Sequence, residues 1–227
     1  QPASTQLTFE ISFSATSIPS GSLELVSYAL SSGTSNDINI WIDPSGDLWF
    51  RLSSGAATPL GFDARALIDG TQHQLSITWD GATGDTRFYA DGSQIGVDTY
   101  RVGSSVPWAS GAETSMLMFG QDQDAVGGGF DSTQIFTGNI FEVRMFTDVR
   151  TAPEIAANVN TYLSNPSADP NLLANWRMVN DGSGLISDLT GNHDLTLYNA
   201  ASFNSTFSVA ENASNGTRIA SAVDVTD

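Results

Sequence analysis

Residues 39–52 read Asn39-Ile40-Trp41-Ile42-Asp43-Pro44-Ser45-Gly46-Asp47-Leu48-Trp49-Phe50-Arg51-Leu52. Two apolar runs flank the turn sequence at 43–46, which predicts a β-hairpin. Residues 74–79 and 86–90 predict a second hairpin, and residues 7–13 alternate apolar and polar side chains as a half-buried strand does. Regularly spaced strands separated by turn residues are typical of a sandwich or jelly roll. We therefore expect an all-β fold, a jelly-roll sandwich of two antiparallel sheets.

One short helix is expected to pack on this sandwich. Thr151 and Glu154 have the spacing of a capping box, and Pro153 falls in the first turn, where its missing N–H costs nothing. The apolar residues that follow at helical spacing are Ile155, Val159, Tyr162 and Leu163. Further along the chain, residues 175–178 and 195–197 predict strands.

The composition limits the possible partners. The chain has 227 residues, with 25 acids, 8 bases and a formal net charge of -17. A field of that sign repels nucleic acid and anionic membranes, so cations and neutral, hydroxyl-rich ligands are the expected partners. No apolar run approaches the roughly 20 residues needed to cross a bilayer, so no membrane insertion is expected. The absence of cysteine excludes disulfides and thiolate sites, and the start Gln1-Pro2-Ala3 suggests an excised piece of a larger protein.

The segment 119–134 concentrates potential metal ligands. Asp122, Asp124 and Asp131 lie close together in it, and the glycines 127–129 interrupt the acids. Calcium takes about six to eight oxygens from carboxylates, amides and carbonyls, and glycines let a loop fold its oxygens inward. Without a cation the carboxylates would repel one another. This pattern favours a calcium site, with an ordinary solvated Gly/Asp loop as the alternative.

Two family resemblances support this interpretation. Gly120-Gln121-Asp122-Gln123-Asp124-x-x-Gly127-Gly128-x-Phe130-Asp131-x-x-Gln134, followed by Gly138-Asn139-Ile140 and a Pro-Glu-Ile helix start, resembles the double-calcium loop of the pentraxins. The run 73–81 and residues 175–198 are closer to laminin-G-like domains. Both families share one concanavalin A-like jelly-roll architecture, so the two resemblances are compatible.

The pentraxin resemblance implies a set of calcium ligands, for two ions. Side-chain oxygens would come from Asp122, Asp124, Asp131 and Gln134, and a backbone carbonyl from Gln123. Asn36 and Asp37 would contribute from an earlier loop. The resemblance also implies that open calcium positions hold ligand oxygens, beside Asn36 and Asp124.

The ligand is expected to be a sugar. The missing cysteines remove the family disulfide, which argues against an animal blood pentraxin, and segment 53–60 has no acid that could contact a choline headgroup. Vicinal hydroxyls on calcium are therefore the expected contact. Trp108, in a loop, is the candidate stacking platform, whereas Trp41, Trp49, Trp79 and Trp176 lie in strand patterns and are expected in the core.

Two domains are expected. Residues 1–206 would form the jelly roll, and 207–227 a linker or the first strand of a following domain. Val209-Ala210-Glu211-Asn212 resembles the opening of a cadherin-like repeat, whose matching Glu helps bind inter-domain calcium. These features predict an extracellular, cell-surface adhesin of the bacterial repeats-in-toxin kind, in which neighbouring domains of the same chain are partners.

The expected function is a calcium-dependent carbohydrate-binding (lectin) module, not an enzyme. It would bind cell-surface glycans or polysaccharide through calcium. The alternatives are a glycoside hydrolase or lyase on the same fold and a structural spacer domain. A retaining hydrolase needs two carboxylates facing each other across a sugar cleft, but glutamates are few and no strand carries a closely alternating Glu-x-Asp-x-x-Glu pattern.

Overall fold

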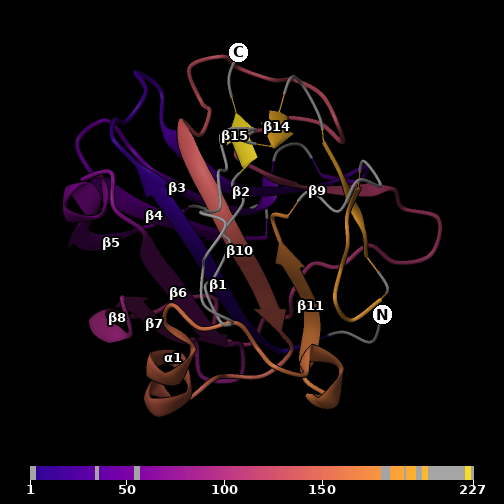
Figure 1. The fold of residues 1–227 in the computed structure, drawn as a ribbon. Helices are drawn as coiled ribbons and strands as arrows, with labels where there is room; N and C mark the ends of the chain where they lie inside the picture. Colours follow the sequence, from indigo (N-terminus) through magenta and orange to yellow (C-terminus); the bar gives the residue numbers. More distant parts are fainter. Residues whose placement is uncertain are drawn as a thin grey trace.

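The computed structural model describes residues 4–33, 36–53, 57–179, 185–191, 193–197, 201–203 and 223–225. Its strands form an eight-stranded antiparallel sheet, a five-stranded antiparallel sheet and a two-stranded ribbon (Figure 1). The eight-stranded sheet has the order β14 (Ala201–Phe203), β15 (Val223–Val225), β10 (Gly138–Phe146), β1 (Gln6–Ala15), β6 (His73–Asp80), β7 (Asp85–Ala90) and β8 (Ser93–Thr99), with β11 (Leu172–Arg177) also paired to β10.

The five-stranded sheet has the order β5 (Thr58–Asp63), β4 (Asp47–Leu52), β3 (Asn36–Ile42), β2 (Leu23–Leu30) and β9 (Ser115–Phe119). The ribbon pairs β12 (Leu185–Ile186) with β13 (Leu195–Thr196), and short 3₁₀ turns cover Ala64–Leu67 and Pro166–Ala168. Both predicted hairpins are confirmed, as β3–β4 and β6–β7. The all-β prediction of two antiparallel sheets and one helix is therefore confirmed.

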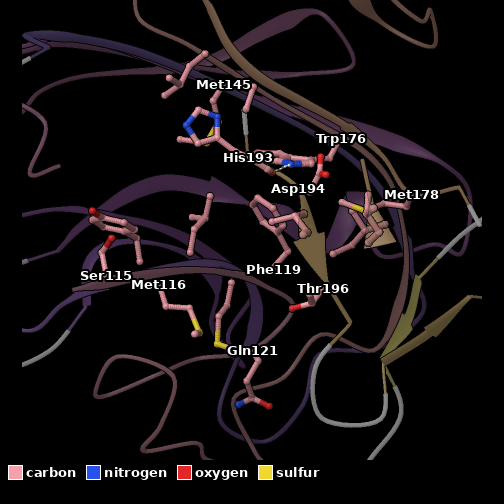
Figure 2. Close-up of a pocket in the computed structure, with 18 of the residues that line it drawn as sticks. Ser115, Met116, Phe119, Gln121, Met145, Trp176, Met178, His193, Asp194 and Thr196 are labelled. Atoms are coloured by element: carbon pink, nitrogen blue, oxygen red, sulfur yellow. Dashed lines mark hydrogen bonds between the residues drawn. The ribbon is translucent and has the colours of Figure 1, made fainter. Parts of the chain in front are cut away.

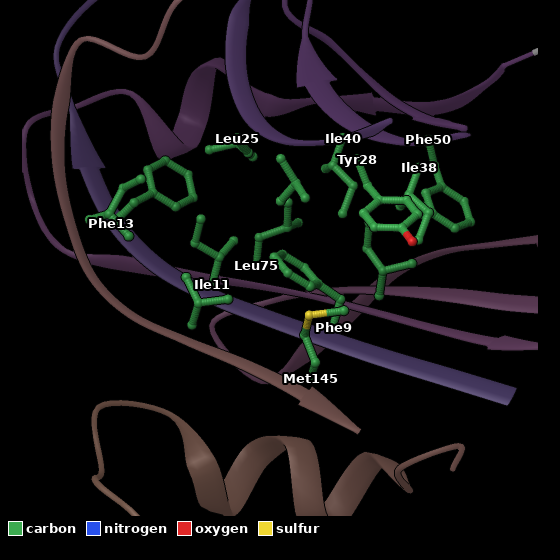
Figure 3. Packing of buried hydrophobic residues seen from close by; sticks show 14 of the residues in the cluster. Phe9, Ile11, Phe13, Leu25, Tyr28, Ile38, Ile40, Phe50, Leu75 and Met145 are labelled. Atoms are coloured by element: carbon green, nitrogen blue, oxygen red, sulfur yellow. The ribbon is translucent and has the colours of Figure 1, made fainter. Parts of the chain in front are cut away.

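The core lies between the two sheets. Alternate residues of β1 point into it, beginning with Phe9, Ile11 and Phe13, each at most 3% exposed. Ile40 and Phe50 meet them from β3 and β4 (Figure 3). Because side chains alternate along a strand, the residues between these apolar positions on β3 and β4 must point away from the core. The outer face of the five-stranded sheet is therefore available for a binding site.

The helix is shorter than predicted. Helix α1 spans Ala152–Asn158, and the capping box between Thr151 and Glu154 is present. The apolar face was expected to continue to Leu163, but the helix ends at Asn158. Val159 is its extended C-cap, and Asn160 has φ 52°. That left-handed conformation cannot continue a right-handed helix. Ile155 is thus the one member of the predicted face that is both helical and buried.

Most of the predicted tail, 207–227, lies outside the described residues, including Glu211. Within it, β15 pairs with β14 and joins β10, with Val223 opposite Ile140. No helix in the described part of the chain is long and apolar enough to cross a membrane.

Candidate functional site

A polar pocket of about 210 Å³ opens beside the outer face of the five-stranded sheet. Its lining comes from the start of β2, from β3 and β4, and from the loop between β9 and β10. The residues are Gly21, Ser22, Glu24, Asn36, Asn39, Trp41, Arg51, Asp122, Asp124 and Gln134. We call this cavity the polar pocket. Sequence segments as far apart as residues 21 and 134 therefore build one site.

A β-bulge positions the two asparagines. In the β2–β3 ladder Tyr28 faces Ile38 and the next residue, Ala29, faces Asn36, which leaves Asp37 as the extra residue. A bulge breaks the strict alternation of a strand. Asn36 and Asn39, three residues apart, can therefore both donate through Nδ2 to Asp122 Oδ1, Asn39 at 3.3 Å.

The segment 119–134, which we call the acidic loop, is anchored near its C-terminal end to the two residues that precede β2. Gly21 N and Ser22 N both donate to Thr133 O at 3.0 Å, and Ser22 bridges Gln134. A Cβ on Gly21 would lie 2.5 Å from Thr133 O, so this close approach requires glycine. The anchor keeps Gln134 at the edge of the pocket.

Gln123 holds the middle of the loop in place. Its fully buried side-chain amide donates to Ser27 O at 3.1 Å and to Met116 O at 3.0 Å, and its Oε1 accepts from Gly127 N at 3.0 Å. These bonds place Asp122 and Asp124 on either side of an immobilised residue. The role predicted for the Gln123 backbone carbonyl, as a calcium ligand, stays a prediction.

Acidic side chains gather in the polar pocket, where their charged forms are unfavourable without a cation. Burial raises the pKa of Asp122, the hydrogen bond from Asn36 opposes this, and the charge of Asp124 raises it again. Burial, followed by the charge of Asp122, raises the pKa of Glu24 well above its ordinary value. Carboxylates that are desolvated and repel one another are stabilised by a cation placed between them.

Three buried oxygens of the pocket have no hydrogen-bond partner: Glu24 Oε1, Asn36 Oδ1 and Asn39 Oδ1. An unpaired buried acceptor costs about 1–3 kcal/mol, and carboxylate and amide oxygens are the ligands that calcium prefers. The described residues contain no group of three or more His, Cys, Asp or Glu side chains that could hold a metal ion by themselves. The donor set therefore fits calcium if amide oxygens take part.

The structure brings together four of the predicted ligands, Asn36, Asp122, Asp124 and Gln134. Asp37 and Asp131 do not line the pocket. Asp37 Oδ2 accepts from Leu30 N at 3.1 Å, because the bulge turns this side chain elsewhere. Asp131 Oδ1 accepts from Thr133 N and Oγ1, both at 2.8 Å, and these bonds lower its pKa.

Sequence reasoning missed Glu24, Asn39 and Arg51 as pocket residues. The available signal was the alternation of β3 and β4, which places Asn39 opposite Arg51 on the outer face. The same alternation corrects the placement of two tryptophans. Trp41 and Trp49 stack on that face, with ring centroids 5.7 Å apart and planes at 7°, and are not core residues. The predicted burial of Trp79 and Trp176 is confirmed.

Trp108 lines a different and larger cavity of about 630 Å³ between β9, β11 and the β12–β13 ribbon. Its ring packs edge-on against Tyr28 with centroids 5.6 Å apart. Figure 2 shows apolar side chains, among them Phe119 and Trp176, around this space, with polar residues such as His193 at its border. Trp108 is not among the residues of the polar pocket, so its role in ligand binding stays a prediction.

Comparison with known proteins identifies the family. The sequence profile described as the Pentaxin family matches residues 4–182. The chain belongs to the pentaxin (pentraxin) family. Among curated pentaxins, the C-reactive protein of Mesocricetus auratus is 30% identical over 156 residues, which are 69% of this chain and 63% of that protein. The pentraxin fusion protein of Xenopus laevis is 30% identical over 115 residues, which are 50% of this chain and 25% of that protein. The chain thus spans less than two thirds of these relatives.

Solved structures show the same fold. A heptameric SAP-like pentraxin from Limulus polyphemus has a TM-score of 0.53 at 18% identity, covering 72% of this pentaxin and 78% of that chain. A putative carbohydrate binding protein from Bacteroides ovatus has a TM-score of 0.60 at 18% identity, covering 85% and 51%. A CBM40 module of the Ruminococcus gnavus IT-sialidase, bound to α2,3-sialyllactose, has a TM-score of 0.52 at 15% identity, covering 70% and 84%.

Proposed function

We propose that this pentaxin is a calcium-dependent carbohydrate-binding module that holds glycan hydroxyls on calcium in the polar pocket. One observation carries the proposal: three unpaired buried oxygens and two carboxylates of the acidic loop share a single pocket. Family membership supports it, and so does the description of two proteins with this fold as carbohydrate-binding.

Asp122, Asp124, Asn36 and Gln134 would hold the cation. When bound, calcium would neutralise the acids and offer open positions to ligand oxygens. Asn39, fixed by its bond to Asp122, would orient that carboxylate. Two ions, as the pentraxin resemblance implies, would require Asp131 to exchange its bonds to Thr133 for metal.

The tryptophan stack supports a sugar ligand. Trp41 lines the polar pocket and stacks on Trp49 on an outer, partly exposed face. An aromatic face gives the apolar side of a sugar ring a surface to pack on, while its hydroxyls reach the cation. We assign no catalytic role to these residues, because binding on calcium requires none.

We further propose that residues 207–227 lead into a following cadherin-like domain of an extracellular, cell-surface adhesin of the repeats-in-toxin kind. Their resemblance to a cadherin-like opening and the absence of cysteine support this. The sequence of the complete parent protein tests it: the absence of neighbouring repeats there would contradict the proposal.

Thermal unfolding tests the lectin function. The protein is unfolded with calcium or with chelator, each with and without a panel of simple sugars. We expect calcium to raise Tm and sugar to raise it further only when calcium is present, because a ligand that binds the folded state stabilises it. A Tm that calcium does not change would refute the metal site. A calcium effect to which no sugar adds would refute the lectin and leave a calcium-stabilised spacer.

A further inference from the structure

We propose that Arg51 makes the polar pocket selective for acidic sugars, by donating to a carboxylate of the glycan that binds there. The inference rests on the proposed lectin function and adds the class of sugar. It concerns a residue that the calcium-loop motif does not include.

Arg51 differs from five of the arginines that the structure describes, because it has no carboxylate partner. The chain has 8 basic residues, all arginine. Five of them form ion pairs with carboxylates: Arg65, Arg87, Arg144, Arg150 and Arg177. Arg101 donates to the carbonyl oxygen of Leu52 at 3.0 Å. Among the described residues, Arg51 and Arg101 form no ion pair. Within this part of the chain, the buried Nε of Arg51 has no hydrogen-bond acceptor. The same is true of Arg144, Arg150 and Arg177, but those three arginines form ion pairs.

The guanidinium of Arg51 is held at the pocket by its neighbours. Its central carbon lies 5.6 Å from the centroid of the Trp41 ring, a cation–π distance. Arg51 is half-buried and lines the polar pocket together with Glu24 and Asp122, both almost completely buried. The group is therefore positioned at the cavity and is not a mobile surface arginine.

If calcium binds in the polar pocket, the guanidinium of Arg51 lies close to a second positive charge. Calcium and a guanidinium in one small pocket repel each other, because two positive charges at short range are unfavourable at low dielectric. Glu24, Asp122 and Asp124 already place acids beside both charges, and an anionic ligand group would reduce the repulsion further. A carboxylate also matches the planar donor fork of arginine and can satisfy the unpaired N–H, which a single sugar hydroxyl does less well.

The overall charge of the protein limits how an acidic glycan could be recognised. At a net charge of -17, the long-range field opposes the approach of an acidic glycan. Selectivity for an acid must therefore come from a short-range donor, and among the arginines that the structure describes Arg51 is the one that lines this pocket. Added salt should weaken the long-range repulsion more than the short contact.

The test compares matched sugars and matched variants. Calorimetric titration of calcium-saturated protein measures Kd for methyl glucoside and methyl glucuronide, with a 6-sulfated glucoside as a third arm. The variants are Arg51→Gln and, as control, Arg65→Gln, whose arginine pairs with Asp63 on the surface. We expect wild type and Arg65→Gln to bind the glucuronide about tenfold more tightly than the glucoside. Arg51→Gln should bind both sugars alike, because it lacks the charge-assisted hydrogen bond from the guanidinium to the sugar carboxylate. Tighter binding of the sulfated sugar would identify sulfate in place of carboxylate as the acid recognised.

Calcium titration without sugar gives an independent measurement. Arg51→Gln should bind calcium at least as tightly as wild type, because a neighbouring positive charge is removed. Neutral sugar binding with no acid preference, or a preference that survives in Arg51→Gln, would overturn the role of Arg51 and leave the lectin intact. Failure of all three sugars to bind calcium-saturated wild type would overturn the acid selectivity. The lectin proposal falls as well only if no sugar of the wider panel adds to the effect of calcium on Tm.

Discussion

The side-chain amide of Asn36 donates a hydrogen bond to the carboxylate of Asp122, 86 residues further along the chain. Both side chains are buried, at 2% and 4% exposure. The bond ties strand β3 to the acidic loop through the amide nitrogen of Asn36. The single amide oxygen, Oδ1, has no partner and belongs to a residue that lines the same pocket. The loop and the sheet therefore form one site, and changes on either side should be felt in calcium binding.

Replacing Asp122 should remove most of the calcium effect. In Asp122→Asn we expect calcium affinity to fall at least about tenfold, since a charged ligand becomes neutral. The metal-free protein should lose little stability, because burial already disfavours the charged carboxylate. Calorimetric calcium titration and Tm with chelator measure the two effects. Asp85→Asn, at a surface ion pair with Arg87, is the control; equal calcium affinity in both variants would contradict the site.

Substitutions at Asn36 and Asp37 should have different effects on calcium affinity. Asn36→Ala removes a pocket oxygen and should weaken calcium binding by about tenfold, whereas Asp37→Asn should leave it within about twofold. Asp37→Asn instead weakens the hydrogen bond from Leu30 N, and this should lower the free energy of unfolding by about 1 kcal/mol. Calcium titration and urea unfolding of both variants check this. A larger loss of calcium affinity in Asp37→Asn would show that Asp37 turns toward the metal.

Two glycines of the acidic loop test whether the position of Asp124 matters for calcium binding. Gly129 has φ +71°, and a Cβ there would lie 2.9 Å from Asp124 Cβ, whereas a Cβ on Gly128 meets nothing within 4 Å. Gly129→Ala should therefore displace Asp124 and weaken calcium binding severalfold, and Gly128→Ala should not. Calcium titration of the pair decides this, and similar affinities in the two variants would count against a role for Asp124.

His73 should make stability depend on pH. Burial lowers the pKa of His73, but hydrogen bonds to Asp91 at 2.8 Å and Asp69 at 3.1 Å outweigh it, so the pKa lies above its ordinary 6.5. A raised pKa means that the folded state binds the proton more tightly. The contribution of protonated His73 to the free energy of unfolding is therefore complete below pH 6.5. It is lost as the pH rises through the higher pKa that His73 has in the folded state.

Urea unfolding at pH values below and above the pKa of His73 measures this loss of stability. The loss should stay under about 1 kcal/mol, because the carboxylates of Asp69 and Asp91 are half exposed. His73→Gln should flatten that part of the profile. Stability that rises with pH in wild type relative to His73→Gln would reverse the sign and contradict the assignment.

The sequence predicted the elements that depend on local pattern. Alternation identified β1 and both hairpins, and the spacing of Thr151, Pro153 and Glu154 identified where α1 begins. The end of α1 was missed, because apolar spacing continues past Val159 although the backbone at Asn160 turns left-handed. The family motif likewise located Asp122, Asp124 and Gln134 in one loop, since their spacing is local.

What only the tertiary structure decided is which side chains face that loop. The bulge at Asp37 selects Asn36 and Asn39 over Asp37, and the pairing of β3 with β4 brings Arg51 and Trp41 to the pocket. Sequence by itself determined that this is a jelly roll with an acidic, glycine-rich loop, because alternation and turn chemistry act between near neighbours. Ladder register is a long-range property, and a one-residue shift reverses the face of every side chain that follows. The composition of the pocket was therefore settled only when the strands paired.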